Sequence, residues 1–192
     1  HPLNDVVEDR FYVIHDSNVS EAPSDDSGNI TYEKLTESSL YDATSNIIGE
    51  SEGTQQLDAE TQLNAADGWY IRLTRAGEKV LASSLTLQHQ VYFTTYEPEP
   101  NSSACTVSAG TARLYHMNAK DATPIVNYDG VGGDAITSLT RSDREVVLKT
   151  TAIAPSPMRL RVGGEDVIVV GTEPIKPPED NVVYTRTYWF EE

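Results

Sequence analysis

Short segments rich in aromatic and β-branched residues, set apart by turn residues about every 8–12 positions, are the feature that most constrains this sequence. The clearest lie at residues 10–15, 90–96 and 111–118. Further strands are expected at residues 30–35, 69–73, 80–87, 145–150, 158–162, 166–170 and 182–190. We expect residues 10–15 to be buried. Many short strands at this spacing are typical of a sandwich, barrel or propeller, so the sequence predicts an all-β fold.

One or two short helices are expected among these strands. Thr36 precedes Glu37-Ser38-Ser39-Leu40-Tyr41 and is placed as the N-cap of a short helix. Residues 54–66 combine Gln, Ala, Leu and Glu, which are good helix formers, and give the strongest helical pattern in the sequence.

The strand–turn–strand units, joined by long connections, fit the blades of a propeller. A four-stranded blade takes about 40–45 residues, so 192 residues would make about four blades. Three or four blades of a larger ring are favoured over a closed four-bladed ring. Such an incomplete propeller would expose a strand edge, which would pair with the missing blades or with another chain.

The charge of the chain excludes some classes of partner. It carries 30 acidic and 14 basic residues, a formal net charge of −16. Half of the acidic residues, 15, lie in residues 1–68 beside two basic residues, whereas residues 69–192 hold the other 15 and 12 basic residues. An anionic nucleic-acid backbone or membrane surface would be repelled, so we expect neither nucleic-acid binding nor membrane insertion. The two parts are expected to be an acidic strand, loop and helix region and a strand-rich region of blades.

The single cysteine, Cys105, excludes a disulfide within this sequence and a cysteine-rich zinc site. Two alternatives remain for it. A lone thiol in an oxidising compartment either packs as a small buried hydrophobe or pairs with a cysteine of another segment or chain.

Two acidic loops are candidate calcium sites because hard cations prefer clustered oxygen ligands. The candidate ligands are Asp16, Asn18, Asp25 and Asp26. The first loop lacks the glycine and glutamate expected at the sixth and twelfth positions of an EF-hand loop, and the second is shorter still. A solvated acidic loop is therefore the favoured interpretation of each.

No catalytic motif accompanies these loops. The sequence has no GxSxG, HExxH, phosphate-binding glycine loop or CxxC, and its four histidines are scattered singly. We therefore predict a binding or assembly module without enzymatic activity or a bound cofactor. Two alternatives stay open. One is a stand-alone carbohydrate- or peptide-binding module with an aromatic patch from Trp69, Tyr70, Tyr188 and Trp189, although core positions are favoured for these residues. The other is a hydrolytic propeller enzyme.

The order of several segments resembles a known family. Residues Asp9-Arg10-Phe11-Tyr12-Val13-Ile14-His15-Asp16 are followed by Leu35 to Thr44 and then by Gly68-Trp69-Tyr70-Ile71-Arg72-Leu73. Gly77-Glu78-Lys79-Val80, Val91 to Tyr96 and Cys105 through Tyr115 continue the order. Together these segments, which span most of the chain, resemble the C-terminal β-propeller of type IV pilus tip and biogenesis proteins of the PilY or PilC type.

The resemblance implies the last blades of a propeller in an exported bacterial protein at the cell surface or pilus tip. It implies roles in pilus assembly, control of retraction and adhesion to host or abiotic surfaces, with minor pilins as partners. His1-Pro2-Leu3 would then lie inside the propeller domain. Family members can carry a calcium loop of alternating Asp and Asn, which has no counterpart here, so no residue inherits that role. The expected contact surfaces are loops 17–29, 97–110 and 172–181.

Overall fold

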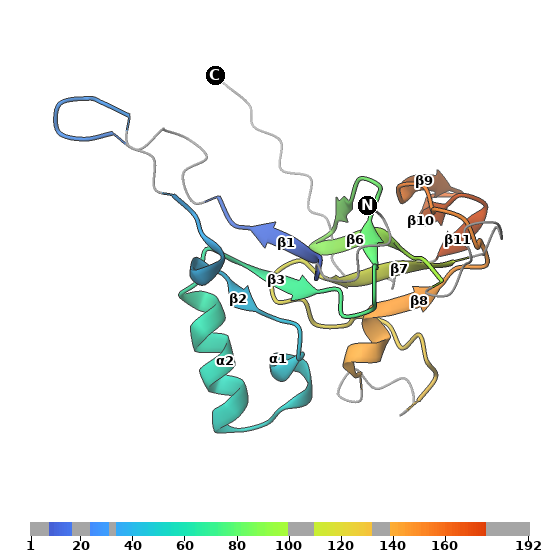
Figure 1. Cartoon of the computed structure of the whole chain (residues 1–192), viewed down its shortest axis with the longest axis horizontal. Helices are drawn as coiled ribbons and strands as arrows, with labels where there is room; N and C mark the ends of the chain where they lie inside the picture. Colours follow the sequence, from blue (N-terminus) through green and yellow to red (C-terminus); the bar gives the residue numbers. More distant parts are fainter. Residues whose placement is uncertain (1–7, 17–23, 31–33, 100–109, 132–138, 176–192) are drawn as a thin grey trace, which may run out of the picture.

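Three β-sheets follow one another along the chain in the computed structural model (Figure 1). The structure describes residues 8–16, 24–30, 34–99, 110–131 and 139–175. The first sheet has the order β1-β3-β2, in which β3 pairs antiparallel with β1 and parallel with β2. Its strands are β1 (Arg10–Ile14), β2 (Tyr41–Asp42) and β3 (Gly68–Arg72).

Helices connect the strands of the first sheet. The chain passes through η1 (Glu37–Ser39) before β2, and through α1 (Ile47–Glu50) and α2 (Thr54–Asn64) between β2 and β3. Ala59 and Leu63 of α2 are buried in the core beside the first sheet. Within the described ranges, no helix has the length and apolar character needed to cross a membrane.

The second sheet is an antiparallel meander in chain order. Both β4 and β5 pair with β6, which pairs with β7, which in turn pairs with β8. The strands are β4 (Lys79–Val80), β5 (Leu85–Leu87), β6 (Gln90–Glu97), β7 (Thr111–Asn118) and β8 (Glu145–Val147), and η3 (Arg141–Arg144) leads into β8. Gln88 and His89, the two turn residues between β5 and β6, both have positive φ, of 51° and 59°. A two-residue hairpin turn adopts this conformation because its twist then matches the twist of the two strands.

The third sheet has the order β11-β10-β9, again antiparallel between neighbours in sequence. Its strands are β9 (Met158–Val162), β10 (Glu165–Val170) and β11 (Glu173–Ile175). Ile168 and Val170 of β10 are buried against the second sheet.

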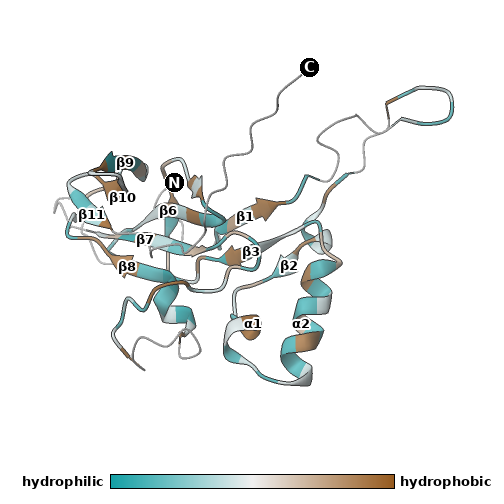
Figure 2. Cartoon of the chain, turned by 180° about the vertical axis from the view of Figure 1, so that it is seen from behind, coloured by the Kyte–Doolittle hydropathy of each residue, from teal (hydrophilic) through white to brown (hydrophobic). Residues whose placement is uncertain are grey.

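The second sheet is buried on both faces. Side chains alternate between the two faces of a strand, so β6 turns Val91 and Phe93 toward one core and Tyr92 toward the other. The first core also contains Trp69 and Ile71 of β3, and the second contains Ile168 of β10. Figure 2 shows hydrophobic stretches along β1 and β3 and mixed hydropathy along α2.

Stacked aromatic rings join the first two sheets. The ring of Phe93 lies between Phe11 of β1, with centroids 3.8 Å apart, and Tyr115 of β7, with centroids 4.8 Å apart. Trp69 is fully buried beside them, and its indole N–H donates to the carbonyl of Ala119 at 2.9 Å. The ring contacts fix β1 over β6, although about 80 residues separate the two strands in sequence.

Gly68 allows β1 and β3 to approach. Its φ is +149°, and a Cβ atom there would lie 2.1 Å from the carbonyl oxygen of Val13 and 2.9 Å from the Cα of Ile14. Any other residue would push the two strands apart, so glycine is required where β3 begins.

The all-β prediction is confirmed at the level of fold class, since the described residues form three sheets and the two α-helices α1 and α2. The described sheets do not close into a ring or barrel. The strands expected at 10–15, 69–73, 90–96, 111–118, 158–162 and 166–170 are present within a residue or two, as is the helix at 54–66. The acidic region 1–68 contributes β1 and β2 to a sheet whose third strand is β3, so the first sheet crosses position 68.

Several expected elements differ. β1 is only partly buried, and on one face: Phe11 and Val13 pack against the first core, whereas Tyr12 and Ile14 are exposed. The expected strand 80–87 is split into β4 and β5, and between them the Ser83 N–H donates to the hydroxyl of Ser156 instead of pairing with β6. The expected helix after Thr36 is the short η1 alone.

Further differences concern β8, β11 and two other expected strands. β8 ends at Val147. The Leu148 amide still donates to the Ala112 carbonyl of β7, but the amides of Lys149 and Thr150 donate to the Glu173 carboxylate. The predicted contact loop 172–181 contains β11, whose Pro174 is tolerated at a sheet edge. In the expected strand 30–35, residues 34–35 are not in a strand and 31–33 lie outside the described residues. The strand expected at 182–190 also lies outside them.

Candidate functional site

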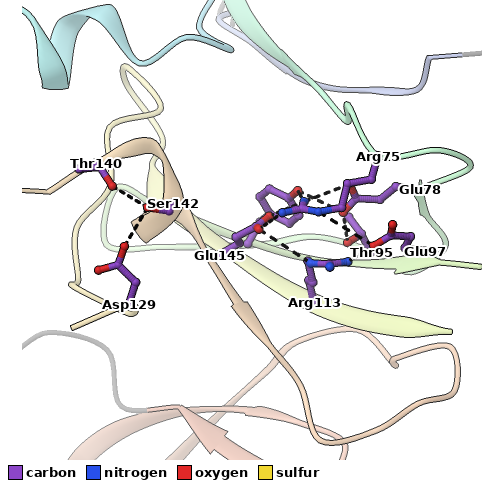
Figure 3. A network of polar contacts seen from close by, with 10 residues as sticks. Arg75, Glu78, Thr95, Glu97, Arg113, Asp129, Thr140, Ser142 and Glu145 are labelled. Atoms are coloured by element: carbon purple, nitrogen blue, oxygen red, sulfur yellow. Dashed lines mark hydrogen bonds and ion pairs between the residues drawn. The ribbon is translucent and has the colours of Figure 1, made fainter. Parts of the chain in front are cut away.

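A cluster of charged side chains lies where the first sheet meets the second (Figure 3). Arg75, in the turn after β3, is its centre. The Arg75 guanidinium makes a two-point ion pair with the Glu145 carboxylate of β8, with Nη1 2.9 Å from Oε2. It also donates to the hydroxyl of Tyr115 on β7, at 3.0 Å. Arg75 therefore joins the chain after the first sheet to the far edge of the second.

Glu78 is the buried carboxylate of this cluster. Its side chain has no solvent exposure, and its Oε1 accepts from the hydroxyls of Thr95, at 2.6 Å, and Tyr115, at 3.1 Å. Its Oε2 lies 3.4 Å from Nη1 of Arg75. Because a buried carboxylate is stable only when its oxygens are bonded or paired, these three partners account for its position.

A second arginine extends the cluster along the sheet. Arg113 of β7 donates to Glu97 of β6 at 2.6 Å, and its Nε lies 3.8 Å from Glu145. Thus Arg75 and Arg113 share Glu145 between them. The two arginines and three glutamates, with a formal charge of −1, link the turn after β3 to β6, β7 and β8.

The electrostatics of the cluster keep its donors protonated. Burial raises the pKa of Tyr115, and the negative charges of Glu78 and Glu145 raise it further. For Arg75, burial alone would lower the pKa, but the hydrogen bond to Glu145 and the nearby negative charges outweigh it and raise the pKa. Both groups therefore remain donors at neutral pH, and the arrangement acts as a fixed polar joint between two sheets.

A pocket of about 150 Å³ opens beside this joint. It lies between the end of β3, the segment after β2, η3 and the start of β8. Its lining residues are Thr44, Ile71, Arg72, Thr74, Arg75, Tyr115, Arg141, Ser142, Arg144 and Glu145. The pocket is thus lined by four arginines of an acidic chain.

Arg144 is the most deeply buried of these arginines, with 3% of its surface exposed. Its Nη1 donates to the carbonyl of Ala43 at 2.9 Å, and its Nη2 donates to the side-chain oxygen of Asn46 at 2.8 Å. Its Nε is buried without a hydrogen-bond acceptor. Burial lowers the pKa of Arg144 to about 10, and the like charge of Arg141 lowers it as well, against the raising effect of Glu50 and Asp121.

A buried histidine lies on the other face of the second sheet. His116 of β7 is fully buried, stacks on Tyr92 with centroids 4.2 Å apart, and lies 2.8 Å from both Gln90 Oε1 and the hydroxyl of Tyr128. Because the Gln90 oxygen can only accept, Nε2 of His116 carries the proton and Nδ1 accepts from Tyr128. Burial lowers the pKa of His116 to about 4, so the ring is neutral at pH 7.

The predicted calcium ligands have other surroundings. The Asp25 carboxylate accepts from the backbone N–H groups of Ser27 and Asn29 and from the Asn29 side chain, which organises the turn between Ser24 and Ile30. The hydrogen bonds from Asn29 lower the pKa of Asp25. Asp26 lies in the same exposed turn. In the part of the chain that is described, no three His, Cys, Asp or Glu side chains form a group able to hold a metal ion.

Some of the remaining predicted site residues lie within the described residues and others lie outside them. Asp16 ends the described segment after β1, whereas Asn18 and Cys105 lie outside the described residues. Trp69 and Tyr70 are buried, as favoured from the sequence, and do not form an exposed aromatic patch. Tyr188 and Trp189, their proposed companions, lie outside the described residues.

The arginine and glutamate cluster was not predicted. Of its residues, Glu145 was expected at the start of a strand, and it is the first residue of β8. Glu145 is 70 residues from Arg75, so no local pattern indicates the pair. The weak signal available was the charged residues on strands that are otherwise apolar, such as Arg113 in β7.

Comparisons with known proteins returned no match: no family model, no curated protein and no solved structure is similar to this chain at a significant level.

We predict that Thr95→Val will lower the free energy of unfolding by about 1.5–3 kcal/mol, because Thr95 donates to a charged, buried carboxylate. The matched control is Thr94→Val. Thr94 is equally buried but donates to a neutral carbonyl, that of Pro155, so its loss should be about 0.5–1.5 kcal/mol. Urea unfolding followed by circular dichroism measures both, and equal losses would contradict a charged role for Glu78.

A second prediction concerns pH. The unfolded chain protonates His116 near its ordinary pKa of 6.5, but the folded chain does so only near 4. Stability is therefore full above pH 6.5 and falls as the pH is lowered toward 4, with a loss of about 2 kcal/mol from this residue between pH 7 and pH 5.

The measurement is urea unfolding at a series of pH values. His116→Gln should remove this part of the pH dependence. His89→Asn, at an exposed turn position, should retain it. An unchanged pH profile in the His116 variant would show that other groups cause the loss.

Proposed function

We propose that this chain is part of the β-propeller of a type IV pilus tip-associated protein of the PilY or PilC type. In this proposal it supports pilus assembly, control of retraction and surface adhesion by binding other proteins. The observation that carries the proposal is the stacking of three consecutive sheets, with the middle sheet buried on both faces. Successive blades of a propeller pack in this way.

The second sheet supports the proposal by its connectivity. A propeller blade is a four-stranded antiparallel meander in chain order, and β6, β7 and β8 follow β4 and β5 in that order. β4 and β5 share the first position, since both pair with β6. The segment from Lys79 to Val147 is longer than a common blade because long connections follow β6 and β7.

The third sheet also supports the proposal, through its face that points away from the second sheet. Residues directly opposite in an antiparallel pair point to the same side, so Met158 and Leu160 share a face with Val169 and Val167. This is the face opposite to Ile168 and Val170. Met158, Leu160 and Val162 are 55%, 46% and 62% exposed. A further blade packed on this apolar face would bury it.

The location follows from the same proposal. A pilus-tip protein is exported, so the chain would work at the cell surface, with minor pilins, the remaining blades and a host or abiotic surface as partners. The alternative of a stand-alone carbohydrate- or peptide-binding module has less support, because Trp69 and Tyr70 are core residues and not an exposed platform.

The propeller part of the proposal predicts a context-dependent effect of Leu160→Ala. In the 192-residue chain the change should alter the free energy of unfolding by less than about 0.5 kcal/mol, because the side chain is half exposed. In the complete parent protein it should cost about 2 kcal/mol or more, because a neighbouring blade covers the residue. Leu57→Ala on the exposed side of α2 is the control and should have a small effect in both. Equally small effects of Leu160→Ala in both proteins would contradict the propeller.

The pilus part is tested by co-purification. The complete parent protein, tagged and expressed in the bacterium that encodes it, should retain the minor pilins after mild extraction of the pili. A tagged exported protein of similar charge serves as the control. If the parent protein binds no minor pilin and its deletion leaves pilus number unchanged, the pilus function is wrong, whatever the result for Leu160.

A further inference from the structure

The structure assigns an oxyanion site to the pocket beside the Arg75 cluster: we propose that it binds one carboxylate, from a small organic acid or from an acidic side chain. Four of the 14 basic residues of the chain line this single pocket, namely Arg72, Arg75, Arg141 and Arg144. Such a concentration is unexpected in a chain of net charge −16. The inference stands independently of the proposed pilus function.

Two of the four arginines are neutralised by the protein itself. Arg72 lies 3.1 Å from Asp42 and 3.6 Å from Glu8, and Arg75 is paired with Glu145. These pairs hold the two side chains at the pocket but leave no net charge from them to attract a ligand.

The guanidinium groups of the other two arginines are not paired directly with a carboxylate in the described part of the chain. Arg144 bonds only to neutral oxygens, those of Ala43, Thr44 and Asn46. The Arg141 guanidinium has no ion pair in the described part of the chain. The Glu50 carboxylate accepts from the backbone N–H of Arg141 and from the side chain of Asn46. Burial lowers the pKa of Arg144 despite the nearby charges of Glu50 and Asp121, so its positive charge is held in the interior without a directly bonded carboxylate, which is destabilising. A bound anion would place a negative charge next to Arg141 and Arg144.

Guanidinium groups are also the donors best placed for a ligand. The hydroxyl of Thr44 already donates to Asp42, and that of Ser142 donates to Asp129. The Nε atoms of Arg72 and Arg144 are buried and closed to a ligand, and Arg141 is the exposed arginine of the lining. A planar carboxylate matches the paired N–H groups of an arginine, which makes such contacts strong and specific.

The size and charge of the pocket favour a carboxylate over a larger or more highly charged anion. A volume of about 150 Å³ holds about five water molecules, enough for a carboxylate and its adjoining carbon. Glu145 also lines the pocket. Its negative charge, although paired, repels a dianion more strongly than a monoanion.

The test is a titration of the ¹⁵N-labelled 192-residue chain with sodium acetate at constant ionic strength, balanced with sodium chloride, and followed by NMR. The amides of residues 44, 72, 75 and 142 should shift together and saturate, with a dissociation constant in the millimolar range. Arg141→Gln should raise that constant about tenfold, because one charged hydrogen bond is lost. Arg161→Gln, an exposed arginine on β9, is the matched control and should leave it unchanged.

Arg141 is chosen for substitution because it is exposed, whereas replacing the buried Arg144 would destabilise the folded chain. A second titration uses a short Gly/Ser peptide with one central Glu, against the same peptide with Gln. Tighter binding of the Glu peptide than of acetate identifies an acidic side chain as the natural source, and binding of acetate alone identifies a free acid. Absence of saturable shifts, equal affinity of the Arg141 variant, or tighter binding of inorganic phosphate than of acetate would overturn the carboxylate assignment.

Discussion

The burial of the second sheet on both faces is the constraint on which the rest of the structure depends. A sheet with one solvent-exposed face needs apolar residues only at alternate positions of each strand. In β6, however, all residues from Gln90 to Thr95 are buried. The polar members of this run, Gln90, Thr94 and Thr95, must then find partners inside the protein. They do so with His116, the carbonyl of Pro155 and Glu78, so the polar contacts on each face follow from the packing.

The charged cluster joins the buried sheet to its neighbour in addition to the aromatic contacts between them. Glu78 carries a charge into the interior, where it is matched by hydroxyl donors and by Arg75. Arg75 in turn requires Glu145, so the start of β8 is fixed relative to the turn after β3. The same geometry brings η3 and its arginines against the segment after β2, and the arginine-lined pocket is the result.

The strands could be predicted where local composition and packing agree. β3, β6 and β7 combine aromatic or β-branched residues with clear turns, and their positions were correct. β11 was missed because Gly171 and Pro174 indicate a loop. Pairing with β10 at the edge of the sheet overrides that local preference. The charged cluster and the pocket depend on contacts across 70 to 101 residues, for which no spacing rule exists. Local acidic composition was the only basis for the calcium candidates, and at Asp25 the carboxylate organises a turn.

The serial arrangement of the sheets also determines which parts of the chain can open without global unfolding. The third sheet shares its core with the second and takes no part in the core that contains Trp69 and Phe93. In architectures where each unit touches only its neighbours, opening begins at an end and does not require the interior to melt. Amide protons of β9 and β10 should therefore exchange with solvent through partial opening, while those of β6 and β7 exchange only when the chain unfolds as a whole.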